Sequence, residues 1–223
     1  EKELMMRIGA MTDDVMEKTI AFLKPGLSEL DIVDFIESEL RKLGASPSTA
    51  QPIVGSGQYS AQPHYRPQTE KVIQQGDAVV LDFGGTLKHY HSDMTRTVFI
   101  GEPDKEFQKI YNAVREAHDA AMAFAKPGVK CEDVDSVARR VISDYGYGEY
   151  FIHRTGHGIG LEVHEEPYIV QGNTAILEPG MAFSIEPGIY IPGRYGVRIE
   201  DCGIVCDNGI EPFTEFPAEL TVS

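Results

Sequence analysis

Long hydrophobic runs and cysteines are both scarce in this chain of 223 residues. No stretch is long and apolar enough to span a bilayer, and none has the basic-then-apolar order of a secretory leader. The three cysteines, Cys131, Cys202 and Cys206, cannot all pair, so we expect free thiols in a reducing, cytoplasmic setting. Cys202 and Cys206 lack the other half of a zinc site, which favours a role as small buried residues.

Basic residues are also few, with 20 lysines and arginines against 35 acidic residues and a formal net charge of -15. Nucleic acids and anionic membranes bind basic surfaces, so this balance argues against both as main partners. The apolar fraction of 42% and the charged fraction of 25% are ordinary for a soluble globular protein. Because the chain begins at Glu1 without methionine, we expect it to be part of something longer.

Two pairs of helices are predicted, and a Lys-Pro-Gly triplet separates the members of each pair. The first pair covers 2–23 and the stretch from the N-cap Ser28 to Gly44, and the second covers 104–124 and 131–145. Strands are expected at 78–83 and 93–100 and over most of the last third. The apolar residues predicted to face the core from the first helix are Leu4, Ile8, Met11, Val15 and Ile20.

The two halves of the chain repeat each other. Lys24-Pro25-Gly26 recurs 102 residues later as 126–128, Asp82 matches Glu186 at 104, and Asp93 matches Glu200 at 107. Chance similarity of two helix ends is the alternative, but a register that continues through the acids favours duplication. We therefore expect one α+β domain over 1–223, with halves of roughly 1–103 and 104–223 around a pseudo-two-fold axis and helices outside.

Four carboxylates stand at or near the ends of predicted strands. Asp82 follows the apolar run 78–81, and Glu186 follows the run 181–185. A carboxylate at the end of a buried strand is costly unless it is paired or bound to a cation. Solvated strand ends are the alternative, but they do not explain the duplicated register. The expected metal ligands are Asp82, Asp93, His157, Glu186 and Glu200.

These five side chains suit a pair of divalent cations. Four carboxylates balance four positive charges, an imidazole adds a neutral nitrogen, and a water between the ions would ionise near neutral pH. Mn²⁺, Co²⁺, Fe²⁺ and Zn²⁺ all fit such donors. We expect a turn at Gly84-Gly85 that sets Asp82 and Asp93 face to face on neighbouring strands. Strand alternation places Arg198 on the face of Glu200, where it would orient an acid that binds metal.

A glycine-rich segment from His153 to Gly160 holds two histidines four residues apart. Its three glycines oppose a helical zinc motif and predict a close approach of backbone to a metal or substrate. With His64 and His164, these histidines are expected to act as ligand, proton donor and transition-state stabiliser, against the alternative of ordinary partly buried histidines. His89, His91 and His118 are expected to be surface or structural, and Tyr190 and Tyr195 to pack in the core or rim.

At these residues the chain resembles the pita-bread metallopeptidases and, within them, the Xaa-Pro peptidases aminopeptidase P and prolidase. The resemblance covers nearly the whole chain. Its motifs are Pro63-His64-Tyr65, Leu81-Asp82-Phe83-Gly84, Ser92-Asp93-Met94-Thr95-Arg96-Thr97, His153 to Gly160, His164-Glu165, Ile185-Glu186-Pro187-Gly188, Val197-Arg198-Ile199-Glu200-Asp201 and the tail from Pro212 to Leu220.

The resemblance implies a pita-bread fold, in which duplicated α/β halves form a curved antiparallel sheet with outer helices. It implies that Asp82 binds one metal, that Asp93 and Glu200 bridge two, and that His157 and Glu186 bind the second, with Mn²⁺ as the leading candidate. Glu186 would also shuttle a proton and His164 would steady the scissile carbonyl. His64, His153 and Arg198 would contact substrate, the two histidines on the proline side. The N-terminal domain usual in the family is expected to be absent from this chain.

The leading functional hypothesis is hydrolysis of the bond between an N-terminal residue and proline, in short peptides with proline in second position. A methionine aminopeptidase shares the five ligands but generally lacks matches to His153 and Arg198. A peptide- or protein-binding module without activity and a metal-free, creatinase-like hydrolase are further alternatives, and the complete set of acids argues against both. The sequence leaves open dipeptidase against aminopeptidase, and whether the chain forms a homodimer.

Overall fold

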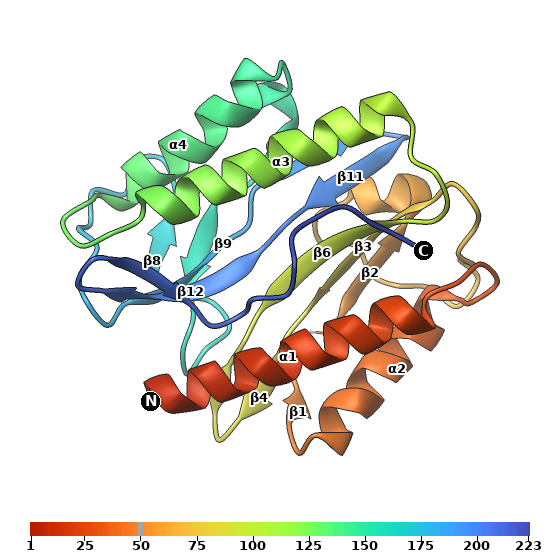
Figure 1. The fold of residues 1–223 in the computed structure, drawn as a ribbon, viewed down its shortest axis with the longest axis horizontal. Coiled ribbons are helices and arrows are strands. Elements are labelled where there is room, and N and C mark those ends of the chain that lie inside the picture. Colours follow the sequence, from red (N-terminus) through yellow and green to blue (C-terminus); the bar gives the residue numbers. More distant parts are fainter. Residues whose placement is uncertain (49–50) are drawn as a thin grey trace.

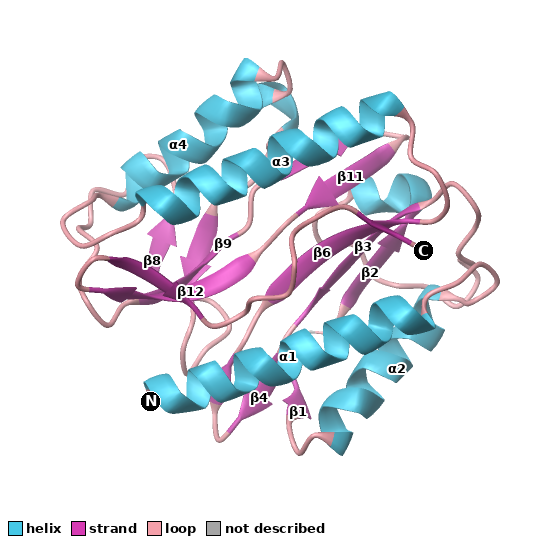
Figure 2. Cartoon of the chain, viewed as in Figure 1, coloured by secondary structure: helices cyan, strands magenta, loops and turns pink. Residues whose placement is uncertain are grey.

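Two pairs of helices enclose the strands of the protein, whose computed structural model describes residues 1–48 and 51–223. Figure 1 shows one pair above the strands and the other below them, and Figure 2 shows the strands running between the pairs. Among the described helices, none combines the length and apolarity needed to cross a membrane. The helices are α1 (Lys2–Phe22), α2 (Glu29–Lys42), α3 (Lys105–Phe124) and α4 (Cys131–Asp144), with short 3₁₀ turns η1 (Gly57–Ala61) and η2 (Gly148–Tyr150).

Each half contributes an antiparallel set of strands in the same order. One sheet runs β14-β6-β3-β2 and the other β13-β12-β9-β7-β8, so β6-β3-β2 corresponds to β12-β9-β7. The halves join where Thr95 and Glu200 exchange backbone hydrogen bonds of 3.4 and 3.1 Å. The strands of these sheets are β2 (Ile53–Ser56), β3 (Ala78–Phe83), β6 (Met94–Phe99), β7 (Gly156–Gly158), β8 (Glu165–Ile169), β9 (Ala182–Ile185), β12 (Asp201–Cys206), β13 (Gly209–Pro212) and β14 (Thr221–Val222).

Shorter strands complete the described structure. Strands β10 and β11 form a hairpin, and β4 pairs with both β1 and β5. The pairing of β14 with β6 is parallel, an exception to the antiparallel pattern. The bounds are β1 (Ser46–Pro47), β4 (Gly85–Leu87), β5 (Tyr90–His91), β10 (Gly188–Ile191) and β11 (Tyr195–Arg198).

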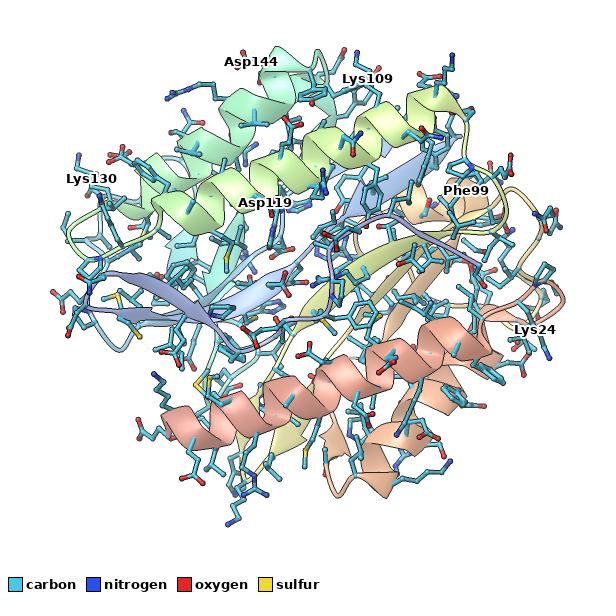
Figure 3. The ribbon with its side chains drawn as sticks, in the orientation of Figure 1. Lys24, Phe99, Lys109, Asp119, Lys130 and Asp144 are labelled. Atoms are coloured by element: carbon cyan, nitrogen blue, oxygen red, sulfur yellow. The ribbon has the colours of Figure 1, made fainter. Side chains whose placement is uncertain are left out.

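The duplication predicted from the sequence is confirmed in detail. After the first helix of each pair, Gly26 (φ +98°) and Gly128 (φ +87°) take the left-handed conformation that glycine tolerates. Isolated bridges then pair Ser28 with Val72 in one half and Lys130 with Ile176 in the other. In Figure 3, Lys24 in the loop between α1 and α2 and Lys130 in the loop between α3 and α4 lie on opposite sides of the molecule, as expected if a two-fold axis relates these loops. The predicted α+β class therefore holds.

The buried face of α1 differs from the predicted one. The predicted Ile8 and Val15 are buried, which confirms them, but Leu4, Met11 and Ile20 are only half-buried, and Met5 and Met16 are buried in addition. Gly9 belongs to the buried face and packs against the C-terminal segment so closely that an added Cβ would lie 1.6 Å from the Phe213 carbonyl oxygen. The buried face also includes Thr12 and Thr19, so it is centred on a stripe that the apolar spacing alone does not mark.

The turn predicted at Gly84-Gly85 is wrong. The chain continues through β4, turns at Lys88 (φ +49°) and His89 (φ +74°), and returns through β5. In the ladder between β3 and β6, Asp82 stands opposite Thr95, and Asp93 lies just before β6. Gly84 is needed for a different reason, because a Cβ there would lie 1.7 Å from the Ser92 carbonyl oxygen.

Replacing Gly9 with alanine tests whether this close packing outweighs helix propensity. Alanine is favoured over glycine by about 1 kcal/mol inside a helix, and overpacking costs about 1–3 kcal/mol. We expect Gly9→Ala to lower the free energy of unfolding in urea. Ala10 is a neighbouring exposed residue, so Ala10→Gly measures the effect of helix propensity alone. We expect this variant to lose about 1 kcal/mol of the free energy of unfolding. A Gly9→Ala protein as stable as the parent would contradict the packing argument.

Candidate metal centre

The five predicted metal ligands reach one cavity from five different places in the fold. Asp82 comes from β3, Asp93 precedes β6, His157 lies in β7, Glu186 follows β9, and Glu200 stands between β11 and β12. All five line a cavity of about 460 Å³. The structure therefore brings together side chains that are as much as 118 positions apart in the sequence.

The ligand atoms form two overlapping groups. Oxygens of Asp82, Asp93 and Glu200 lie within 4.8 Å of one another, and so do atoms of His157, Glu186 and Glu200. Glu200 belongs to both groups, which is the geometry required of a side chain shared between two cations. A third such group joins Asp93, His157 and His164.

The hydrogen bonding of His157 leaves one ring nitrogen free for a ligand. Its Nδ1 lies 3.0 Å from the Gly158 carbonyl oxygen, which can only accept, so Nδ1 carries the proton. Burial lowers the pKa of His157 to about 3, so the ring is neutral and Nε2 has a lone pair. This Nε2 lies 3.5 Å from Glu186, 3.8 Å from Asp93 and 3.9 Å from Glu200. A lone pair surrounded by carboxylate oxygens indicates a place for a cation.

The carboxylates of the centre are hard to ionise without a cation. Burial, followed by the charges of neighbouring acids, raises the pKa of Asp93 and of Glu186 well above their ordinary values. Burial and Asp82 raise the pKa of Glu200 to about 7. The buried Oε1 of Glu200 has no hydrogen-bond partner in the described structure, and a buried polar atom without a partner is costly. The residues present therefore fit divalent cations.

Arg198 connects the acids on the first-half side of the cavity. Its guanidinium donates to Asp82 Oδ2, to Thr95 Oγ1 at 3.1 Å and to the Tyr190 hydroxyl at 2.7 Å. Thr95 in turn donates to Glu200 Oε2 at 2.7 Å. Asp82 and Glu200 are thereby held in fixed orientations, the arrangement expected around metal-binding carboxylates.

Two of these supporting residues were missed by sequence reasoning. Thr95 is two residues from Asp93 along a strand, so strand alternation could have placed it on the same face. Tyr190 was expected to pack in the core or rim, and it is buried, but its hydroxyl also links Arg198 to His153 Nε2 at 2.8 Å. Nothing in the local pattern distinguishes Tyr190 from a core tyrosine.

The histidines take different positions around the cavity. Both nitrogens of His153 are engaged, Nδ1 with the Arg154 carbonyl at 2.7 Å and Nε2 with Tyr190. Burial lowers the pKa of His153 to about 3, so the ring is neutral, and with both nitrogens bonded within the protein it offers the cavity a ring face. His164 lies edge-on to His157 with 4.2 Å between ring centroids, and burial and Arg154 lower its pKa. His64 is an exposed residue that lines the same cavity.

The glycines around His157 face protein backbone. A Cβ on Gly156 would lie 1.8 Å from the Ser184 carbonyl oxygen, and one on Gly158 would lie 2.3 Å from that of Glu166. The expected approach to a metal or substrate is therefore wrong for these two glycines, since neighbouring strands occupy the space. The strand β7 itself confirms that this segment is not helical.

The remaining histidines lie apart from the five ligands. His89 occupies the exposed turn between β4 and β5, and His91 lies 3.0 Å from Thr86 Oγ1. His118 is buried in α3, with Nε2 3.1 Å from Asp201. These positions agree with the expected surface or structural roles.

Arg154 was also missed, because only its place next to His153 marks it in the sequence. It lines the cavity, and its guanidinium lies 4.7 Å from the centroid of the Tyr168 ring. Its positive charge adds to burial in lowering the pKa of His164 and His157, and it opposes the rise in the pKa of Glu186 that burial and the neighbouring acids cause. Within residues 1–48 and 51–223, no carboxylate forms an ion pair with it.

Comparisons with known proteins identify relatives of the chain. Residues 3–207 match metallopeptidase family M24. The chain is 48% identical over its full length to a probable dipeptidase PepE of Mycobacterium tuberculosis and 45% identical to an Xaa-Pro dipeptidase of Lactobacillus delbrueckii, covering 59% and 61% of those proteins. The chain therefore spans about three fifths of the length of these curated relatives.

Solved structures agree with this relationship. The fold superposes on an Xaa-Pro dipeptidase from Bacillus anthracis with a TM-score of 0.98 at 45% identity, covering all of this chain and 62% of that one. An X-Pro aminopeptidase from Thermotoga maritima gives a TM-score of 0.96 at 39% identity, covering all of this chain and 63% of that one. Both classes of proline-directed enzyme are thus similar to this chain.

The raised pKa values predict how metal removal changes stability with pH. Without metal, folded Glu200 keeps its proton up to about pH 7, whereas the unfolded chain releases it near 4.5. The unfolded state therefore binds fewer protons between these values, and stability falls as pH rises through that window, by about 3 kcal/mol for this group. Urea unfolding in EDTA at pH 5, 6 and 7 should show the decline, and a divalent cation should remove it.

Glu200→Gln is the control for this experiment, because glutamine does not titrate. The variant should lose less stability across the same pH range and gain less from added metal. Identical pH slopes for parent and variant, together with no stabilisation by metal, would contradict the assignment.

Proposed function

The chain belongs to metallopeptidase family M24, and on that premise we propose that it is a dinuclear metallopeptidase that cleaves the bond between an N-terminal residue and a following proline. The observation that carries the proposal is the convergence of four carboxylates and a free imidazole nitrogen in one cavity. The names of the relatives support the proline specificity, and since the chain spans only part of their length, the activity is carried over as a proposal.

Asp82, Asp93 and Glu200 would hold one cation, and Asp93, His157, Glu186 and Glu200 the other. Mn²⁺ is the leading candidate, and Co²⁺, Zn²⁺ and Fe²⁺ suit the same oxygen-rich donors. When bound, such cations supply Lewis acidity toward a carbonyl oxygen and activate a water nucleophile. The remaining chemistry belongs to the side chains around them.

The proton shuttle in this proposal is Glu186. Its carboxylate lies in the cavity 3.5 Å from His157 Nε2, and burial raises its pKa, which favours uptake of a proton. His164, neutral because its pKa is lowered, can donate an N–H hydrogen bond to the oxygen of the scissile carbonyl. These groups would receive the proton of the nucleophile and stabilise the charge that develops on the carbonyl oxygen.

The proline side of the substrate would lie against His64 and His153. Because both nitrogens of His153 are bonded within the protein, it presents a ring face, which suits an apolar pyrrolidine ring. Arg198, expected to contact substrate, would act through Asp82 and Tyr190. An Xaa-Pro bond has no amide N–H, so a site that binds the free amine and the carbonyl does not depend on that hydrogen.

Arg154 favours short substrates with a free carboxylate. It lines the cavity together with Arg198, but whereas Arg198 pairs with Asp82, no carboxylate of the described chain pairs with Arg154. The carboxylate of an Xaa-Pro dipeptide would supply the missing partner. This observation supports dipeptidase over aminopeptidase activity.

The alternative functions fit the structure less well. A methionine aminopeptidase would not require the link from Arg198 through Tyr190 to His153. A binding module or a metal-free hydrolase would not require five ligands kept in one cavity. We also propose a cytoplasmic setting, which the free thiols of Cys131, Cys202 and Cys206 support. The homodimer that the family resemblance implies stays a prediction.

Removing a shared ligand tests the proposed mechanism. We expect Asp93→Ala and Glu200→Ala each to abolish tight metal binding in calorimetry and hydrolysis of Xaa-Pro dipeptides with Mn²⁺, Co²⁺ or Zn²⁺. Asp207→Ala, in the exposed turn after β12, is the control and should keep both. Faster hydrolysis of Met-Ala peptides than of Xaa-Pro dipeptides would instead favour the methionine aminopeptidase. Hydrolysis by either ligand variant in metal-depleted buffer would rule out the proposed mechanism.

Replacing Arg154 tests the preference for a free carboxylate. A hydrogen bond to a charged group contributes about 1.5–3 kcal/mol, so Arg154→Gln should raise the KM for Xaa-Pro dipeptides at least about tenfold. The KM for the corresponding Xaa-Pro amides should change little. Arg140→Gln, on the exposed face of α4, is the control. Equal losses on dipeptides and amides would refute the assignment.

A further inference from the structure

Two buried acids outside the cavity have no part in the proposed chemistry. Glu29 lies in the first turn of α2 and Asp135 lies in α4, so each belongs to the second helix of its pair. Both are fully buried, at 0% exposure, and neither lines the cavity. Because a buried carboxylate must be compensated by hydrogen bonds or charge, the partners of these two acids indicate what they hold.

Glu29 binds both ends of one loop. Its Oε1 accepts hydrogen bonds from the Ser56 amide at 2.9 Å and the Ser56 hydroxyl at 2.8 Å, and its Oε2 accepts from the Gln68 amide at 3.1 Å. One carboxylate thus holds together the two residues that flank the segment 57–67. This segment has the length of a compact surface loop whose two ends lie close together. That loop carries His64.

The rest of the loop leaves His64 dependent on its backbone. Ser60 donates to the Gly57 carbonyl at 2.6 Å and accepts from the Gly196 amide at 2.8 Å, while Tyr59 and Tyr65 stack with 5.1 Å between centroids. In the described structure the His64 side chain makes no hydrogen bond, although it lines the cavity. Its position is therefore set by how the loop is anchored.

Asp135 anchors the equivalent segment in the other half. Its Oδ1 accepts from the Thr155 amide at 3.2 Å and the Thr155 hydroxyl at 2.7 Å, and its Oδ2 accepts from Arg139 Nε at 2.7 Å. Arg139 then donates to the carbonyls of Phe151 and His153. The segment 151–155, which carries His153, is thereby held from α4.

The same chemistry recurs in both halves, although Glu29 aligns with Cys131 and not with Asp135 in the sequence repeat. In each case an acid of the second helix binds the amide and the hydroxyl of a Ser or Thr in the segment around a cavity histidine: Ser56 precedes the loop that carries His64, and Thr155 lies two residues after His153. We propose that Glu29 and Asp135 are positioning residues that set the placement of His64 and His153 against the proline ring of the substrate. This inference rests on the proposed function only in treating the two histidines as proline contacts.

Isosteric amides test the proposal without changing side-chain volume. In Glu29→Gln and Asp135→Asn, an NH₂ group replaces one acceptor oxygen and faces an N–H or O–H donor, so one anchor of each segment is lost. Misplacement by about 1 Å can cost up to about 100-fold. We expect KM for Xaa-Pro dipeptides to rise roughly tenfold, with kcat and metal affinity changed less than about twofold.

Double-mutant cycles distinguish positioning from general loosening of the fold. Glu29→Gln should have little effect in a His64→Ala background but its full effect in His153→Ala. Asp135→Asn should show the reverse. Effects of equal size in both backgrounds would overturn the proposal, because they would mean that neither acid acts through its own histidine.

Glu39→Gln is the matched control, since Glu39 is a buried acid of the same helix that pairs with Lys42 and Lys18 away from the loop. It should leave KM unchanged. Amide hydrogen exchange, measured without substrate, should become faster over 57–68 in Glu29→Gln and not in Glu39→Gln. Unchanged exchange over 57–68 in Glu29→Gln would contradict the proposal that Glu29 anchors this loop.

A parent protein that hydrolyses no Xaa-Pro peptide would contradict the proposed function. The exchange measurement would still show whether Glu29 anchors the loop, because it needs no substrate.

Discussion

The burial of four carboxylates in one cavity is the constraint on which the rest of the site depends. Two unit charges about 4 Å apart interact with about 4 kcal/mol at the effective dielectric of a protein surface, so several like pairs are strongly unfavourable. Arg198 offsets part of this repulsion at Asp82, and Thr95 supplies one hydrogen bond to Glu200. What remains is a concentration of acceptor oxygens around the unprotonated Nε2 of His157, and divalent cations are the partners that satisfy all of them together.

The duplicated fold explains how such an arrangement can be built. In each half, two central strands have one end at the cavity, so side chains that are far apart in the sequence lie close together there. The backbone is nearly symmetric, but the side chains are not, since one half supplies two aspartates and the other supplies two glutamates and His157. The symmetry gives a shared cavity, and the differences in side chains allow two unequal cation positions and one proton carrier, Glu186.

Much of this could be predicted from the sequence, because it depends on local pattern or on the repeat. Helix ends follow from Ser28, the glycines and the Lys-Pro-Gly triplets, and the convergence of the acids follows from their duplicated register. The rest depends on contacts between distant segments. The close packing of Gly9 on Phe213 and the anchoring by Glu29 are contacts with residues far away in the chain, and the strands β4 and β5 are not marked by the local pattern. Tyr190 resembles any core tyrosine until its hydroxyl is seen between Arg198 and His153.

The most direct test of the central claim is a crystal structure of the protein grown with Mn²⁺, with the ions located by anomalous scattering. The account predicts two peaks about 3.5–4 Å apart, with Glu200 and Asp93 between them, Asp82 on one and His157 and Glu186 on the other. A cavity without anomalous signal at saturating Mn²⁺, or ions bound elsewhere while these five side chains turn away from one another, would contradict it.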